Sequence, residues 1–338
     1  MRRISLFLLI GLCNTTLPTA FGDEKAFELN NSVLKVHVAD QNGNHGIGSG
    51  VVVSENHVAT NCHVLANARG VHVTKLGQSF SPVAFKADWQ HDLCILKFVD
   101  LPLKAVALGE ARRLKYEEPV FSISFPNNAR KPLTTYGNVK ALYPLDDSLI
   151  IRTTADFRMG ASGGALFNES GKLIGITTFK SPGRNAYFYN LPVEWVKQLL
   201  AQEDISSTRQ TALPFWDAPE EKRPFFMRVV LPYQAEKWEE LAPIAMAWVE
   251  HEPLNSEAWY YLGVTEYHRK NVSEAVKDLK KATQLNQDHA GAYYQLGVIA
   301  AEQGNQAETE RIRMLLSRLD SEAANALEQN TRLCTASC

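Results

Sequence analysis

Between positions 31 and 189, apolar residues occur in short runs that are separated by turn-forming residues. Examples are residues 33–38, 50–53, 71–73, 93–98, 120–125, 149–153 and 173–178, with Gly, Pro and Asn frequent between them. Runs of this length and spacing predict an all-β sandwich or barrel, because no long helical period interrupts them as it would in βαβ units. Residues 192–202 carry apolar side chains at helical spacing and predict a helix that closes the domain. We therefore place an all-β domain at residues 30–203.

The pattern turns helical after residue 234, and one string occurs there twice. AWYYLGV begins at Ala258 and AYYQLGV at Ala292, an offset of 34 residues. This is the period of the tetratricopeptide repeat, in which helix A of each unit packs against helix B. Gly263 is expected where the two helices approach closely, and residues 237–251 resemble the second helix of a preceding half repeat. The helix expected over residues 309–316 is more polar than the pattern, so a generic pair of helical hairpins stays open.

These patterns divide the rest of the chain. The helical repeat domain is expected over residues 235–320, with a C-terminal tail at 321–338. Residues 204–234 contain several prolines and few periodic signals, which indicates a linker. Phe215, Trp216, Phe225 and Phe226 are costly to leave in water, so this linker is expected to be packed in part.

The first 22 residues have the layout of a secretory signal peptide. Arg2 and Arg3 precede an apolar run over residues 4–13, and small and polar residues lead to Gly22, where cleavage is expected. The run is too short to span a bilayer, and Leu12 before Cys13 does not fit a lipoprotein signal. We expect an exported protein, periplasmic or extracellular, without a stable membrane anchor. The formal net charge of -2 argues against a nucleic-acid partner.

Three strings carry the candidate chemistry. GASGGAL, residues 160–166, exposes Ser162 among glycines, TNCHV supplies His63, and DLCIL supplies Asp92. A serine hydroxyl needs a neighbouring base, an imidazole can take and return its proton, and a buried carboxylate orients that imidazole. The amides of Gly160 and Ser162 are expected to form an oxyanion hole. The order His, Asp, Ser along the chain is that of the chymotrypsin-type arrangement.

A family resemblance supports this assignment. GIGSGVVVS, ATNCHV, DLCILKF and GASGGALFNESGKLIGI resemble the trypsin-fold serine proteases, especially the bacterial HtrA-type branch, over about residues 30–200. The resemblance implies two six-stranded β-barrels with the active site between them. Ala161 stands where zymogen-activated trypsins have an aspartate, so no activation ion pair is expected. Tetratricopeptide repeats stand where a PDZ-like segment would follow.

The triad hypothesis also predicts how two of the cysteines pair. Cys62, Cys94, Cys334 and Cys338 remain after signal cleavage, and an oxidising compartment favours disulfides. If His63 and Asp92 share a hydrogen bond, the backbones that carry Cys62 and Cys94 run close together, which predicts a disulfide between them. Two buried free thiols are the alternative. The pairing of Cys334 and Cys338 stays open.

Other candidate sites have less support in the sequence. Cys62, His63, His91 and Cys94 do not match a common zinc spacing, and we expect no metal and no cofactor. The Gly46, Gly48 and Gly50 series precedes a strand rather than a helix, which argues against a nucleotide loop. Asp88 is a rival for the role of Asp92.

The substrate pocket is expected to be lined by Asp156, Thr178, Phe179 and Lys180. Asp156 lies six residues before Ser162, where trypsins place the acidic floor of the pocket, so one hypothesis is cleavage after Lys or Arg. The leading function is an exported serine endopeptidase that acts on proteins or peptides and whose repeats recruit substrates or partners. The alternative is a catalytically inactive protease scaffold that serves as a protein-binding module.

Overall fold

The computed structural model describes residues 20–40, 42–183 and 185–336. The expected signal peptide lies largely outside these residues. Helix α1 (Ala20–Leu29) begins two positions before Gly22, where cleavage is expected, and Ala26 of this helix is buried against the core. No helix in the described ranges is long and apolar enough to cross a membrane.

The first half of the all-β domain is one antiparallel sheet with the strand order β5-β4-β1-β2-β3-β7-β6. Its strands are β1 (Val33–Ala39), β2 (His45–Ser54), β3 (His57–Asn61), β4 (Gly70–Lys75), β5 (Gln78–Phe80), β6 (Ala84–Asp88) and β7 (Leu93–Lys97). Apolar side chains of these strands, such as Leu34, Val52 and Leu96, are fully buried in a shared core. The expected six-stranded barrel is therefore a seven-stranded sheet, because the short strand β5 adds to the edge formed by β4.

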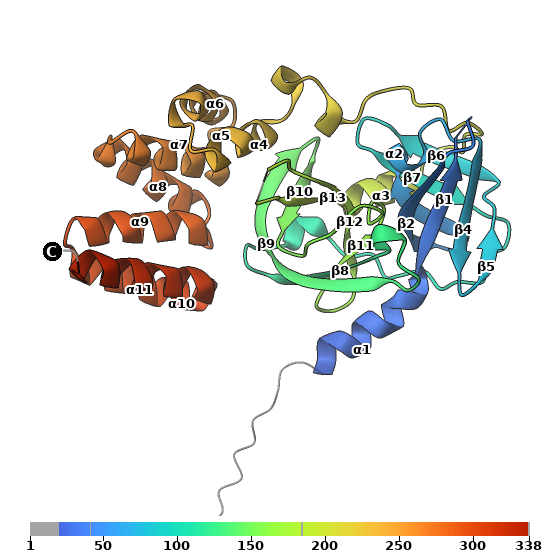
Figure 1. Ribbon diagram of the computed structural model, residues 1–338, viewed down its shortest axis with the longest axis horizontal. Helices are drawn as coiled ribbons and strands as arrows, with labels where there is room; N and C mark the ends of the chain where they lie inside the picture. Colours follow the sequence, from blue (N-terminus) through green and yellow to red (C-terminus); the bar gives the residue numbers. More distant parts are fainter. Residues whose placement is uncertain (1–19, 41, 184, 337–338) are drawn as a thin grey trace, which may run out of the picture.

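The second half is a closed six-stranded barrel with the order β10-β13-β12-β11-β8-β9. Its strands are β8 (Pro119–Ser124), β9 (Leu133–Leu145), β10 (Ser148–Thr153), β11 (Ala165–Asn168), β12 (Leu173–Lys180) and β13 (Phe188–Pro192). Strand β12 is buried over all but its last residue, so it lacks the apolar-polar alternation of a half-exposed strand. Helix α3 (Val193–Leu200) closes the domain as expected and contacts strands of both halves. Figure 1 shows the two halves side by side.

Residues 204–234, named here the interdomain segment, are packed rather than free. They form η4 (Phe215–Asp217), η5 (Glu220–Lys222), α4 (Phe225–Arg228) and α5 (Val230–Gln234). Phe226 stacks on Tyr143 of β9 with ring centroids 4.5 Å apart, and Phe225 stacks on Trp248 of the helical domain. The aromatic residues of this segment thus join the core that both domains share.

The C-terminal domain is an array of antiparallel helices. They are α6 (Trp238–His251), α7 (Ser256–His268), α8 (Val272–Leu285), α9 (Ala290–Glu302), α10 (Gln306–Leu319) and α11 (Ser321–Ala336). At Gly263 a Cβ atom would lie 2.8 Å from Leu279 Cγ, so α7 and α8 approach closely where the sequence requires it. The expected C-terminal tail is instead helix α11, which packs on α9 and α10 and buries Leu327.

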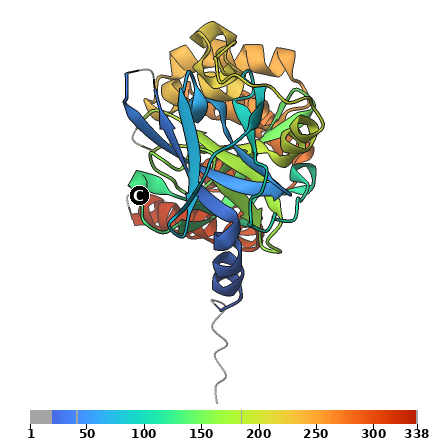
Figure 2. The ribbon, with the colours of Figure 1, turned by 90° about the vertical axis from the view of Figure 1, so that its right-hand side faces the viewer.

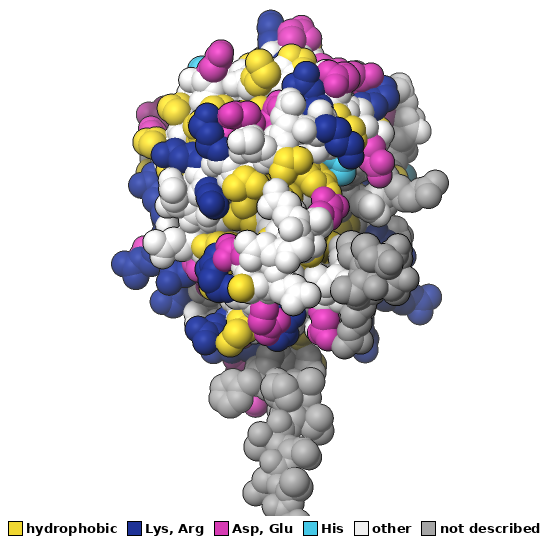
Figure 3. All heavy atoms as spheres, turned by 90° about the vertical axis from the view of Figure 1, so that its left-hand side faces the viewer, with side chains coloured by type: hydrophobic (Ala, Val, Ile, Leu, Met, Phe, Trp, Pro, Cys, Tyr) yellow, Lys and Arg dark blue, Asp and Glu magenta, His cyan; other side chains and the backbone are white. Residues whose placement is uncertain are grey.

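The helical array contacts the six-stranded barrel and lies on its far side from the first sheet (Figures 1 and 2). The Tyr116 hydroxyl donates to Glu257 of α7 at 2.9 Å, and Lys140 Nζ of β9 lies 2.7 Å from Asp320. The outer face of the array carries basic and acidic side chains interspersed with apolar ones (Figure 3).

Candidate active site

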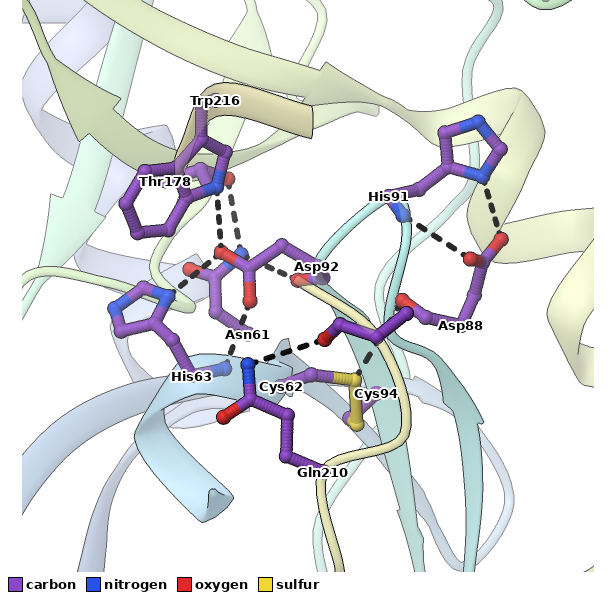
Figure 4. The surroundings of a disulfide bond; sticks show 11 residues. Asn61, Cys62, His63, Asp88, His91, Asp92, Cys94, Thr178, Gln210 and Trp216 are labelled. Atoms are coloured by element: carbon purple, nitrogen blue, oxygen red, sulfur yellow. Dashed lines mark hydrogen bonds and ion pairs between the residues drawn. A yellow bond between two sulfur atoms is a disulfide. The ribbon is translucent and has the colours of Figure 1, made fainter. Parts of the chain in front are cut away.

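His63 and Asp92 lie together at the end of the first sheet. The one-turn helix α2 (Cys62–Leu65) follows β3 and carries His63, and Asp92 lies in the turn between β6 and β7. His63 Nδ1 is 2.6 Å from Asp92 Oδ2, and the His63 amide donates to Asp92 Oδ1 at 2.7 Å (Figure 4). Asp92 is 1% exposed. Two contacts to one buried carboxylate fix both the backbone and the ring of His63.

The structure joins Cys62 and Cys94 by a disulfide, with their Cα atoms 4.9 Å apart (Figure 4). Strand β3 pairs with β7 so that Thr60 faces Cys94, which brings the first turn of α2 over β7. Both sulfurs are used in this bond, so they are not available as metal thiolates. Over the described residues, no group of three or more His, Cys, Asp or Glu side chains could hold a metal ion.

Ser162 lies in the turn before β11 and is tied to the first sheet. Its carbonyl accepts from the Ser49 amide of β2 at 2.7 Å, and Ser49 Oγ donates to the Gly160 carbonyl at 2.8 Å. The Ser162 hydroxyl donates to the Thr178 carbonyl at 3.3 Å. Both Ser162 and His63 are described, and no hydrogen bond joins their side chains.

The turn that carries Ser162 depends on two glycines with positive φ. Gly160 has φ +89°, and a Cβ there would lie 2.9 Å from the Phe125 carbonyl oxygen. Gly163 has φ +86°, and a Cβ there would lie 2.1 Å from the Ser49 carbonyl oxygen. The Met159 carbonyl accepts from the Asn127 amide at 2.6 Å, whereas the Gly160 and Ser162 amides donate to no described protein group.

Two further residues contact Asp92 and were not predicted from the sequence as site residues. Asn61 Nδ2 donates to the Asp92 carbonyl and to Thr178 Oγ1, each at 3.0 Å. Trp216 of the interdomain segment donates from Nε1 to Asp92 Oδ2 at 3.0 Å, and its ring meets the His63 ring edge to face at 5.5 Å. The available signal for Trp216 was an aromatic pair in an otherwise polar, Pro-rich stretch.

The expected pocket residues divide into two groups. Thr178 and Phe179 are buried on β12, while Lys180 at its end is exposed. Phe179 and Lys180 line a cavity of about 230 Å³ together with Trp216, Met227 and Leu231 of the interdomain segment.

Asp156 is exposed, so its carboxylate lies at the surface rather than at a pocket floor. Its neighbour Phe157 is the buried side chain here and packs edge to face on Phe188 at 5.0 Å. At this point of the chain the interior position is therefore taken by an aromatic ring and not by an acidic side chain.

Asp88, the rival of Asp92, has its own partner. Its Oδ2 lies 2.6 Å from His91 Nδ1, and His91 Nε2 lies 3.0 Å from Asp146. Burial alone would lower the pKa of His91, but the two carboxylates outweigh it and raise that pKa. Asp88 therefore pairs with a different imidazole from the one that Asp92 holds.

Two known families match parts of the chain. Residues 48–176 match the family described as trypsin-like peptidase domain, and residues 256–289 match the tetratricopeptide repeat. Both matches agree with the motifs that the sequence provided.

Curated relatives match over the first domain. Serine protease HTRA1B of Danio rerio is 32% identical over 166 residues, which cover 46% of this chain and 34% of that protein. Serine endoprotease DegS of Haemophilus influenzae is 32% identical over 163 residues, 46% of this chain and 47% of that protein. A probable periplasmic serine endoprotease, DegP-like, of Chlamydia trachomatis is 29% identical over 165 residues, 46% of this chain and 33% of that protein. This chain thus spans between a third and a half of the length of these relatives.

Among solved structures, the active form of the Rv3671c protease from M. tuberculosis aligns with a TM-score of 0.52 and 20% identity. The alignment covers 62% of this chain and 97% of that one. At this identity the likeness concerns the fold.

Proposed function

Since this chain carries a trypsin-like peptidase domain followed by a tetratricopeptide repeat, we propose that it is an exported serine endopeptidase whose repeats recruit substrates or partners. The observation that carries the proposal is the short contact between His63 Nδ1 and the buried Asp92 carboxylate. It fixes the ring tautomer that leaves Nε2 free as a base.

In this proposal Ser162 attacks the peptide carbonyl while His63 Nε2 takes its proton. The C–N bond breaks when His63 returns that proton to the leaving amine, and water then releases the acyl group by the same route in reverse. Asp92 stabilises the imidazolium that forms in each step. The amides of Gly160 and Ser162 donate to the oxyanion of each tetrahedral intermediate.

The resting hydroxyl needs one rearrangement. Ser162 Oγ donates to the Thr178 carbonyl, so attack requires rotation about the Cα–Cβ bond of Ser162 to direct the hydroxyl at His63. The same observation favours the second candidate, an inactive scaffold that binds proteins through its helical repeats. The two candidates differ in whether Ser162 reacts as a nucleophile.

Substrate side chains before the cleaved bond are proposed to contact Thr178, Phe179 and Lys180 at the end of β12. The exposed position of Asp156 weakens the reason for cleavage after Lys or Arg. A peptide library decides this point: cleavage indifferent to basic residues removes the hypothesis. Export is supported by the buried disulfide, since such bonds persist in oxidising compartments.

The test is covalent labelling of the full chain, produced in an oxidising compartment, with a fluorophosphonate probe. Labelling of the wild type that disappears in Ser162→Ala is the expected result. His63→Ala is expected to lower the labelling rate strongly. His57→Ala serves as the matched control, because His57 is the first residue of β3 and His63 follows the other end of that strand. A folded wild type that remains unlabelled, alone and with candidate partners, supports the scaffold instead.

A further inference from the structure

Trp216 reaches the candidate triad from outside the domain that the peptidase family defines. The family match ends at residue 176, and Trp216 lies in η4 of the interdomain segment. The Phe215 amide donates to the Gln90 carbonyl at 2.9 Å, so η4 is fixed to the same turn that carries Asp92. The Trp216 ring stacks on Phe179 with centroids 5.7 Å apart. Backbone and ring contacts together hold the indole over Asp92 (Figure 4).

The Asp92 carboxylate has few donors. Oδ1 accepts from the His63 amide, and Oδ2 accepts from His63 Nδ1 and from Trp216 Nε1. A carboxylate that is 1% exposed cannot replace a lost donor with water unless the surrounding groups move. Each donor therefore helps to orient the carboxylate and stabilises its negative charge.

Other polar neighbours do not supply this contact. The Thr178 hydroxyl donates to the Ile176 carbonyl at 2.8 Å, and Asn61 Nδ2 donates to the backbone carbonyl of Asp92 rather than to its carboxylate. Within the described part of the chain, Trp216 is the one side chain besides His63 that donates to the carboxylate. The peptidase domain alone thus leaves Oδ2 with one donor.

We propose that Trp216 is a positioning residue of the peptidase site, which holds Asp92 through its indole N–H and thereby orients His63. This rests on the proposed role of His63 and Asp92. The functional peptidase unit then extends through η4, beyond residue 203 where the sequence places the domain boundary. A peptidase cut at that boundary keeps all three triad residues but loses the contact that fixes Asp92.

The first test separates donation from packing. Trp216→Phe removes the N–H and keeps a ring against Phe179 and His63, and we expect kcat on a peptide substrate to fall about tenfold, with KM changed less than about twofold. Trp216→Ala also removes the ring, and we expect a loss of about 100-fold together with a higher KM, because the ring lines the adjacent cavity. Trp259→Phe is the matched control, since Trp259 Nε1 donates to the Pro253 carbonyl at 2.9 Å in the helical domain. This control should leave kcat and KM unchanged.

The second test does not depend on activity. The proton between His63 Nδ1 and Asp92 should give a far-downfield NMR resonance, to be assigned by its absence in His63→Ala. Trp216→Phe should shift this resonance and Trp259→Phe should not. A Trp216→Phe protein with unchanged kcat and an unchanged resonance overturns the proposal. If the wild type hydrolyses no peptide, the proposed function fails, while the resonance still decides the role of Trp216.

If Trp216→Phe does not fold, a third measurement, made on the wild type, tests the proposal. With ¹⁵N-labelled indoles, the Trp216 N–H resonance should move as His63 is protonated, because both groups donate to the same oxygen. The Trp259 resonance should stay in place. A Trp216 resonance that does not respond overturns the proposal.

Discussion

Reduction of the Cys62–Cys94 disulfide should destabilise the peptidase domain by several kcal/mol. The two cysteines are 32 residues apart, so the bond closes a loop of about that length in the unfolded chain. The chain-entropy relation gives about 3.7 kcal/mol at 25 °C for such a loop. With a urea dependence of about 2 kcal/mol/M for a domain of this size, the midpoint should fall by roughly 1.8 M on reduction.

The assay compares one protein with itself, oxidised and reduced, so that no side-chain volume changes. Cys334→Ser/Cys338→Ser is the background, because reductant would otherwise also act on any bond made by those residues. Urea unfolding is followed by tryptophan fluorescence, and the transition that moves with reductant is fitted. A midpoint shift below about 0.5 M would contradict the loop argument. Two reactive thiols in the denatured, unreduced background would show that the bond is absent.

Three further changes test separate parts of the structure. Gly160→Ala should lower the fluorophosphonate labelling rate by about 100-fold or more, because Gly160 has φ +89° and its amide is a proposed oxyanion donor. Lys140→Met should destabilise the chain by about 1–2 kcal/mol in urea unfolding, since Lys140 pairs with two carboxylates, one of them Asp320 across the domain contact. His91→Asn should cost more stability at pH 5.5 than at pH 8.5, because a raised pKa in the folded state stabilises below the unfolded value near 6.5, and that contribution is lost as pH rises through the folded pKa.

Two of these changes have a matched control on the same chain. Gly77→Ala adds a Cβ at φ +82° in open space, so labelling should be retained. Lys277→Met breaks an exposed pair with Glu274 and should change stability by less than about 0.5 kcal/mol. For His91→Asn, a stability difference from the wild type that is the same at both pH values would contradict the assigned pairing.

The sequence was most informative where a contact is local in the chain or carried by a short string. The expected runs became strands, the closing helix formed at Val193–Leu200, and Gly263 lies where α7 and α8 approach closely. These features depend on the periodicity of neighbouring residues or on the absence of a side chain, both of which are visible in a sequence.

Features that depend on distant or sparse contacts could not be predicted. Asp92 and Trp216 are 124 positions apart, and nothing near either residue indicates the other. Helix α11 has a polar sequence, and its position is set by a few buried side chains such as Ala324 and Leu327, too few to form a clear apolar stripe. The position of Asp156 along the chain likewise does not show that its side chain is exposed while that of Phe157 is buried, because packing decides this.

The contact between the domains restricts how the helical repeats could carry out the proposed recruitment of a partner. Glu257 of α7 is buried, accepts from Tyr116 and lies 3.1 Å from His289 Nε2. Burial opposes its ionisation, yet His289, Arg152 and Tyr116 together lower its pKa. A buried, ionised group costs free energy when it is left without its partners. The contacts of Glu257 therefore favour one orientation of the array on the barrel.

That orientation turns α7, α9 and α11 toward the barrel. The space left between them is a cavity of about 370 Å³, lined in part by Tyr116, Lys140, Arg152, Tyr260 and Tyr294. This volume holds one or two side chains rather than a peptide laid along three helices. While the domains remain in contact, a protein partner therefore has to insert a side chain into this cavity or bind the outer face seen in Figure 3. A partner that occupied the inner face of all three helices would first have to break the contacts of Glu257 and Lys140 with the opposite domain, so its binding would depend on their protonation and on salt.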